Sequence, residues 1–283
     1  CHSSDLIGQD MADAIAAAET GQTATLIVPY DLQTKASHSI DTRSRPHHKQ
    51  VIDSDEIKSA AELLTGAKKT ALVLGSRFIR RKELMVAATV KQACGCDLLL
   101  ENFPARIERG AGLPDLRRIP YLPEMALDML SKYEVFVFAG AKEPVSFFGY
   151  QGGPAALLKE EQRKFHLGRK THDLAVVLQG LAEELNAPGI LDKGMLPELK
   201  RQAIPRGHLN PEKICSIIAA LQPEEAIIVE EAITTGMMYY PMTSGVPPFS
   251  LLTLTGGAIG QGAPCAVGAA IACPDRPVIN FEA

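Results

Sequence analysis

Hydrophobic residues in this chain gather into short continuous runs that alternate with longer segments of helical periodicity. Such runs, rich in Val, Leu, Ile or Phe, are typical of strands whose two faces are both buried. The strand-like runs cover residues 69–74, 97–100, 135–139, 226–230 and 278–281. The helical segments cover residues 53–64, 81–93, 123–132, 172–185 and 211–221. This alternation predicts an α/β fold with parallel sheets.

Three further segments have less distinct patterns. Residues 10–19 are rich in strong helix formers, and the apolar run Thr23 to Val28 after them predicts a buried strand. Leu157 to Phe165 predicts a helix. Leu251 to Phe281 predicts a strand, a glycine-rich turn, a helix of small residues and a closing strand.

Polar segments without periodicity divide the chain into units. Residues 34–52 and residues 186–208 are both expected to be linkers. Residues 53–185, which lie between them, predict a complete Rossmann-like central domain with a parallel sheet. Residues 1–33 contain a single helix–strand unit, and residues 209–283 stop directly after a strand, so each is expected to be part of a larger α/β domain. We therefore expect a chain that is cut at both ends.

Composition excludes several classes of protein. The 29 basic and 33 acidic residues give a net charge of −4, which predicts no nucleic-acid partner. No apolar stretch is long enough to predict a membrane span. Most of the six cysteines lie in apolar patterns, which suits a reduced, cytoplasmic protein. Cys94 and Cys96 form a C-x-C pair, but no second pair completes a zinc site, so we expect both to be packing residues.

The glycine-rich turn Thr255 to Gly262 (TGGAIGQG) carries the first candidate chemistry. Its spacing matches the T-G-x-x-x-G-x-G fingerprint of short-chain dehydrogenases, in which glycines let the backbone approach a phosphate at a helix N-terminus. Little chain follows Gly262, however, and no Tyr-x-x-x-Lys pair lies downstream. A helix that packs tightly through its glycines is an equally good interpretation of the turn.

A second resemblance covers nearly the whole chain. The order of units resembles the thiamine-diphosphate-dependent enzymes of the acetolactate synthase group, which have a pyrimidine-binding, a central Rossmann-like and a diphosphate-binding domain. Asp10 to Asp31 resembles the end of the first domain, Ala71 to Leu185 the second, and the chain from Leu209 onward the third. Lys142 to Gly153 is similar to the segment after the third strand of the central domain. Gly257 to Gly268 (GAIGQGAPCAVG) is similar to the family pattern G-x-M-G-x-G-L-P-A-A-I-G.

This resemblance implies which residues contact the cofactor. The backbone of Gly257 and Ala258 would lie near the aminopyrimidine ring, and Ile259 would be the bulky residue beneath the bent cofactor. Gly260 would permit the close turn, and the hydroxyl groups of the Thr pair after the strand at 226–230 would bind the diphosphate. The implied cofactor-binding residues are Thr234, Thr235, Gly257, Ala258, Ile259 and Gly260.

The same resemblance implies that other site residues lie outside the chain. The family binds Mg²⁺ through a G-D-G-S motif, and its Asp would come directly after Ala283. The glutamate that activates the cofactor would lie upstream of Cys1. We therefore expect no catalytic and no metal-binding residue in this chain, and no activity from the chain alone. Arg77, Asn102 and Lys142 match no specific FAD site, so FAD is not predicted.

The resemblance thus implies a partial chain of a thiamine-diphosphate- and Mg²⁺-dependent lyase or transferase that acts on a 2-oxo acid. Family members place the cofactor between two subunits, which implies a homodimer or tetramer. Two alternatives stay open: a short-chain-dehydrogenase-like oxidoreductase that uses NAD(P), and a non-catalytic nucleotide-binding module built on residues 53–185.

Overall fold

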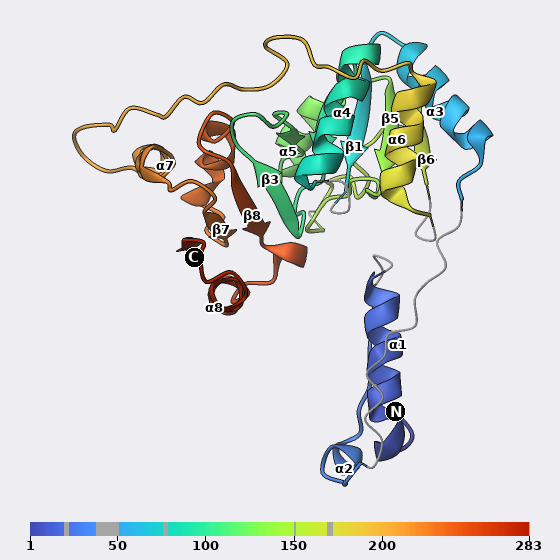
Figure 1. Cartoon of the computed structure of the whole chain (residues 1–283), viewed down its shortest axis with the longest axis vertical. Helices are drawn as coiled ribbons and strands as arrows, with labels where there is room; N and C mark the ends of the chain where they lie inside the picture. The colour runs from blue at the N-terminus through green and yellow to red at the C-terminus, as the bar shows by residue number, and fades with distance from the viewer. Residues whose placement is uncertain (20–22, 38–50, 76–78, 150, 169–171, 283) are drawn as a thin grey trace.

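The computed structural model describes residues 1–19, 23–37, 51–75, 79–149, 151–168 and 172–282, and within these ranges the strands form two sheets (Figure 1). The central sheet is wholly parallel, in the order β4-β2-β1-β5-β6. Its strands are β4 (Arg117–Arg118), β2 (Asp97–Leu100), β1 (Thr70–Leu74), β5 (Val135–Ala139) and β6 (Arg163–Leu167). The second sheet has the order β3-β8-β7-β9. Its strands are β3 (Arg106–Arg109), β8 (Phe249–Thr253), β7 (Ile227–Glu230) and β9 (Val278–Phe281).

In the described ranges, α-helices connect β1 to β2, β4 to β5, β6 to β7 and β8 to β9. Short 3₁₀ turns lie at Gly236–Met238, Tyr240–Met242 and Thr255–Gly257, all at the end of β7 or β8. The helices are α1 (Ile7–Glu19), α2 (Tyr30–Gln33), α3 (Ser54–Thr65), α4 (Arg81–Cys94), α5 (Pro123–Leu130), α6 (Leu174–Glu184), α7 (Pro211–Leu221) and α8 (Gly262–Ala272).

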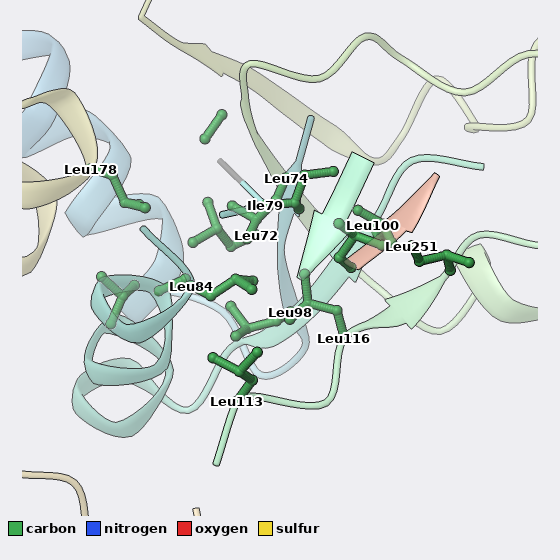
Figure 2. Close-up of a cluster of buried hydrophobic side chains, with 14 of the residues drawn as sticks. Leu72, Leu74, Ile79, Leu84, Leu98, Leu100, Leu113, Leu116, Leu178 and Leu251 are labelled. Carbon is green, nitrogen blue, oxygen red and sulfur yellow. The ribbon is translucent and has the colours of Figure 1, made fainter. Parts of the chain in front are cut away.

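Both faces of the central sheet are covered, which explains why its strands are continuous apolar runs. Leu72 and Leu74 of β1 pack into a cluster with side chains of α3, α4 and α6, several of which are drawn in Figure 2. Ala71 and Val73, on the opposite face of the same strand, pack against α5 and its neighbours. The first cluster continues into the second sheet through residues such as Leu251, so the two sheets share one core.

The antiparallel strand β3 was not predicted. It lies within residues 53–185 but pairs with β8, with Arg106 opposite Leu252 and Arg109 opposite Phe249. Ile107 is buried in the shared core, whereas Arg106 and Glu108 point away from it. One segment of the predicted central domain therefore forms an edge of the second sheet; the domain boundaries stay a prediction.

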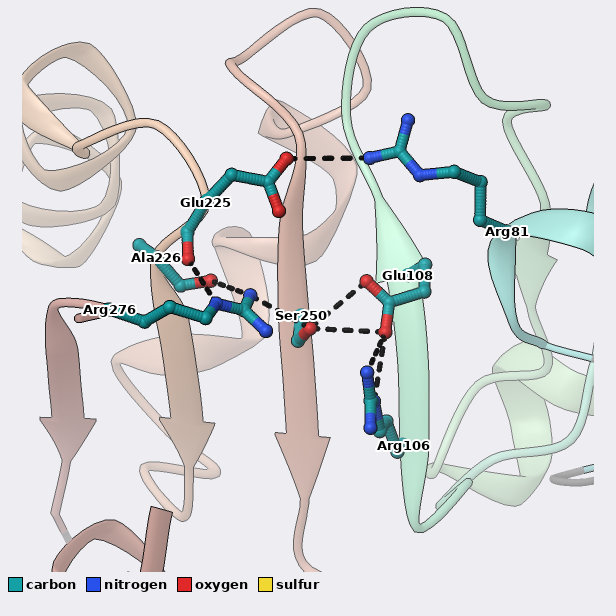
Figure 3. Close-up of polar contacts among 7 residues, drawn as sticks. All are labelled: Arg81, Arg106, Glu108, Glu225, Ala226, Ser250 and Arg276. Carbon is teal, nitrogen blue, oxygen red and sulfur yellow. Dashed lines mark hydrogen bonds and ion pairs between the residues drawn. The ribbon is translucent and has the colours of Figure 1, made fainter. Parts of the chain in front are cut away.

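A polar network joins β3 to the rest of the second sheet (Figure 3). The Ser250 hydroxyl donates to the Glu108 carboxylate at 3.0 Å, and the Arg106 guanidinium donates to that carboxylate as well. Arg276 donates to Ser250 Oγ at 3.0 Å and to the Glu225 carbonyl at 2.7 Å. The network therefore ties β3, β8, the entrance to β7 and the turn before β9 together.

Two expectations about local structure were wrong. Thr23–Val28 has no strand structure, because no described segment pairs with it. Leu157–Phe165 is not a helix. Leu157 is buried in the cluster on the face of the central sheet that α5 covers, and the chain then forms β6, which pairs with β5. The predicted linker 34–52 lies largely outside the described residues, whereas 186–208 is described and contains neither helix nor strand.

Candidate functional site

A cavity of about 780 Å³ lies where the two sheets meet, at the carboxyl ends of β2, β4, β7 and β8. This edge is where open α/β sheets bind their ligands. Residues from both sheets line the cavity, and they include aromatic, aliphatic and charged side chains. The lining residues include Asn102, Phe103, Arg118, Tyr121, Glu230, Glu231, Ala232, Ile233, Met237 and Leu254.

The charged wall of the cavity is internally paired. Arg118 forms an ion pair with Glu230 at 2.8 Å, and both side chains are largely buried. The Tyr240 ring lies between two guanidinium groups, 3.9 Å from that of Arg109 and 4.8 Å from that of Arg118. Burial raises the pKa of Tyr240, and its neutral phenol donates to the Leu116 carbonyl at 2.9 Å. These contacts hold Arg109, Arg118, Glu230 and Tyr240 in place at the cavity.

The glycine-rich turn begins directly after β8, beside this cavity. Gly256, Gly257 and Gly260 have φ angles of 63°, 66° and 92°, which side-chain-bearing residues rarely adopt. A Cβ at Gly257 would lie 2.6 Å from Cζ of Phe147, so the absence of a side chain permits this aromatic contact. Ile259 extends from the turn with 79% of its surface exposed. A large aliphatic side chain is thus left uncovered on this turn.

Glu231, the first residue after β7, holds this turn in place. Its side chain is 2% exposed, and its carboxylate accepts hydrogen bonds from the backbone N–H of Gly260, at 2.5 Å, and of Gly262. Gly262 is the first residue of α8, so the carboxylate satisfies one of the N–H groups that a helix leaves unpaired at its start. A Cβ at Gly262 would be surrounded by oxygens of Glu231, Asn280 and Glu282.

This arrangement bears on what the turn can bind. A dinucleotide fingerprint requires that the helix N-terminus be free to receive a phosphate. Here the start of α8 already holds a buried carboxylate, and a phosphate would meet further oxygens from Asn280 and Glu282. The geometry therefore weighs against the dehydrogenase alternative, although the spacing of its glycines fits.

The two predicted cofactor-binding segments leave the same edge of the second sheet. β7 and β8 are parallel neighbours, and Glu231 links the end of one to the turn after the other. Thr234 is exposed and Thr235 half-buried in the turn after β7, while Ala258 and Gly260 are exposed in the turn after β8. Ile233 and Leu254, which line the cavity, are their close chain neighbours. The six predicted residues themselves are not among the lining residues within the described part of the chain.

Two features of the site were missed from the sequence. The first is Glu231; two consecutive acids after a buried strand are a signal that one of them needs a buried partner. The second is an aromatic cluster formed by Phe103, Tyr121, Phe147 and Phe148, whose neighbouring ring centroids lie 5.3–6.0 Å apart. No periodic sequence pattern predicts this cluster, because its members come from different loops.

The described residues contain no group of three or more His, Cys, Asp and Glu side chains placed to hold a metal ion. Nor does any helix in the described ranges have the length and apolar character needed to cross a membrane.

Comparison with known proteins gave two relatives by sequence, whereas no protein-family model matches the chain. The chain is 37% identical over 278 residues to a Mycobacterium tuberculosis protein assigned as the acetolactate synthase large subunit IlvX. This match covers 98% of the chain and 53% of the relative. The chain is also 34% identical over 109 residues to benzoylformate decarboxylase of Pseudomonas aeruginosa, which covers 38% of the chain and 21% of that enzyme.

Solved structures share the fold. The thiamine diphosphate-dependent 4-hydroxybenzoylformate decarboxylase of Rhodococcus jostii RHA1 superposes with a TM-score of 0.69 at 18% identity, over 98% of this chain and 56% of the enzyme. Benzoylformate decarboxylase from Polynucleobacter necessarius gives a TM-score of 0.66 at 15% identity, with coverage of 98% and 56%. The chain spans about half the length of IlvX and of both of these solved enzymes. Over nearly its whole length it is therefore a relative of the thiamine-diphosphate-dependent enzymes, of the acetolactate synthase large-subunit type.

Proposed function

We propose that the chain forms part of a thiamine-diphosphate- and Mg²⁺-dependent lyase or transferase that acts on 2-oxo acids by decarboxylation or carboligation. Two of the related proteins are named as benzoylformate decarboxylases, and benzoylformate is a 2-oxo acid. When bound, thiamine diphosphate supplies a carbon nucleophile, and its ring stabilises the negative charge left on the substrate carbon after decarboxylation. The proposal includes a homodimer or tetramer as the working assembly.

The residues present fit this cofactor, and the exposed Ile259 is the observation that carries the proposal. Its side chain is uncovered and is the one large aliphatic side chain of the turn Thr255 to Gly262, as expected of a support for a flat ring. In this proposal Gly257, Ala258 and Gly260 offer backbone groups to the same ring. Because Glu231 occupies the start of α8, the diphosphate is assigned to the hydroxyl groups of Thr234 and Thr235 at the other turn.

Titration of the purified chain with thiamine diphosphate and Mg²⁺, followed by calorimetry, tests the proposal. Ile259→Ala removes three carbon groups, so at roughly 0.8 kcal/mol per covered group it is expected to weaken binding up to about 60-fold. Ile271→Ala is the matched control, because Ile271 is 78% exposed but lies on α8 away from the turn. Equal effects of the two substitutions, or no binding to the unsubstituted chain, would overturn the assignment.

Turnover by the chain alone is a separate question. We expect none, since the resemblance assigns the activating glutamate and the metal-binding aspartate to positions outside residues 1–283. Release of CO₂ from pyruvate or benzoylformate by the purified chain, with cofactor and Mg²⁺ present, would contradict this expectation.

A further inference from the structure

Cys94 and Cys96 form a dithiol on the side of the central sheet remote from the proposed cofactor turn. Cys94 is the last residue of α4, and Cys96 comes directly before β2. Gly95 between them has a φ of 73° and ends the helix, with its N–H donating to the Lys91 carbonyl at 2.8 Å. This reversal of the chain brings the two thiols together, and they hydrogen-bond to each other.

The two sulfur atoms differ in access. Cys94 is half-buried, whereas Cys96 is fully buried in the shared core among residues such as Leu98. The space beside Gly95 is open, because a Cβ built there would meet no atom within 4 Å. Cys94 is therefore the thiol of the pair that has solvent exposure, whereas Cys96 has none.

The chemistry of the pair matches this difference. The hydrogen bond from Cys96 lowers the pKa of Cys94 to about 7, so a substantial fraction of Cys94 is thiolate near neutral pH. The same hydrogen bond and burial raise the pKa of Cys96. In its thiol form Cys94 also donates to the Val90 carbonyl at 3.2 Å, a bond that is lost when the proton leaves.

We propose that Cys94 and Cys96 are a redox-active pair that closes to an intramolecular disulfide when exposed to a small-molecule disulfide such as oxidised glutathione. The Cys94 thiolate attacks one sulfur of the oxidant, which forms a mixed disulfide and releases one glutathione thiolate. Cys96 then loses its proton and attacks the Cys94 sulfur, which expels the second glutathione thiolate. The two protein thiols are oxidised, and one glutathione disulfide is reduced to two thiols.

Mass spectrometry of the reduced chain after incubation with oxidised glutathione tests the pair. The peptide that carries both cysteines is expected to lose two hydrogen atoms. Cys96→Ser should instead retain one glutathione on Cys94, because the resolving thiol is missing. Cys94→Ser should leave Cys96 unmodified, because Cys96 has no solvent exposure.

Cys273 is the internal control, since it is also half-buried but has no cysteine two residues away. It should keep its thiol at an oxidant concentration that converts half of the Cys94–Cys96 pair. In urea the difference in oxidation between the Cys94–Cys96 pair and Cys273 should become smaller, because the contact between the two thiols in the folded chain is lost. A pair that stays reduced when Cys273 reacts, or a Cys96→Ser variant that carries no glutathione, would overturn the proposal.

Discussion

At the scale of single residues, Glu231 decides what the glycine-rich turn can bind. Its buried carboxylate takes two backbone N–H groups that a phosphate would otherwise approach. The glycine spacing alone could not distinguish a phosphate-binding turn from a turn that faces a ring, because both need positive φ angles. The distinction depends on a side chain from another strand.

Removing the charge of Glu231 should destabilise the fold. In Glu231→Gln the amide group would face one of the two N–H donors instead of an oxygen, which leaves that donor unsatisfied at a cost of about 1–3 kcal/mol. Urea unfolding measures the change in the free energy of unfolding. Glu224→Gln, at an exposed position, should change it by less than about 0.5 kcal/mol. If the two variants are equally stable, Glu231 does not hold the turn.

At the scale of elements, the helix starts were predictable because their chemistry is local. Asn210 accepts a hydrogen bond from the Lys213 N–H at 2.8 Å, and Pro211 occupies the first helical position of α7. Asp53 caps α3 in the same way, by accepting from the Asp55 N–H at 3.0 Å. Asn and Asp are residue types that favour this capping position, so both helix starts carry a local signal in the sequence.

The N-cap of α7 allows the effect of a substitution on the free energy of unfolding to be predicted. Asn210→Ala should lower the free energy of unfolding by about 1 kcal/mol, because the first turn loses a partner for one of its N–H groups. Thermal or urea denaturation followed by circular dichroism measures it. Arg80→Ala is the control, since Arg80 stands at the same position of α4 but makes no capping hydrogen bond. A loss in the control as large as in Asn210→Ala would mean that capping is not the cause.

The strands divide into those that the sequence predicts and those that it does not. β2 and β5 match the predicted ranges 97–100 and 135–139, because a strand buried on both faces needs an uninterrupted apolar run. β3, β4 and β6 were missed. Each carries charged residues in place of an uninterrupted apolar run, so only pairing with a neighbouring strand identifies it. The fold class and the edge strand β9 were therefore predictable, whereas the edge strands β3, β4 and β6 and the cavity between the sheets were not.

At the scale of the whole molecule, the two sheets should unfold together, because one hydrophobic cluster runs through both. Hydrogen exchange in increasing urea, read by mass spectrometry, should show β1 and β8 losing protection at the same concentration. Earlier loss of protection in β8 would mean that the second sheet is an independent unit.

The insertion of β3 has a consequence for synthesis on the ribosome. Glu108 of β3 and its partner Ser250 of β8 are 142 residues apart. At roughly 5–20 residues per second, β3 leaves the ribosome on the order of 10 s before β8 exists to pair with it. During that interval it is an unpaired segment, and the charges of Arg106, Glu108 and Arg109 help to keep such a segment from associating with other nascent chains. Because charged residues interrupt its apolar pattern, β3 was not predicted from the sequence. The same charges disfavour association of this segment until β8 has been made.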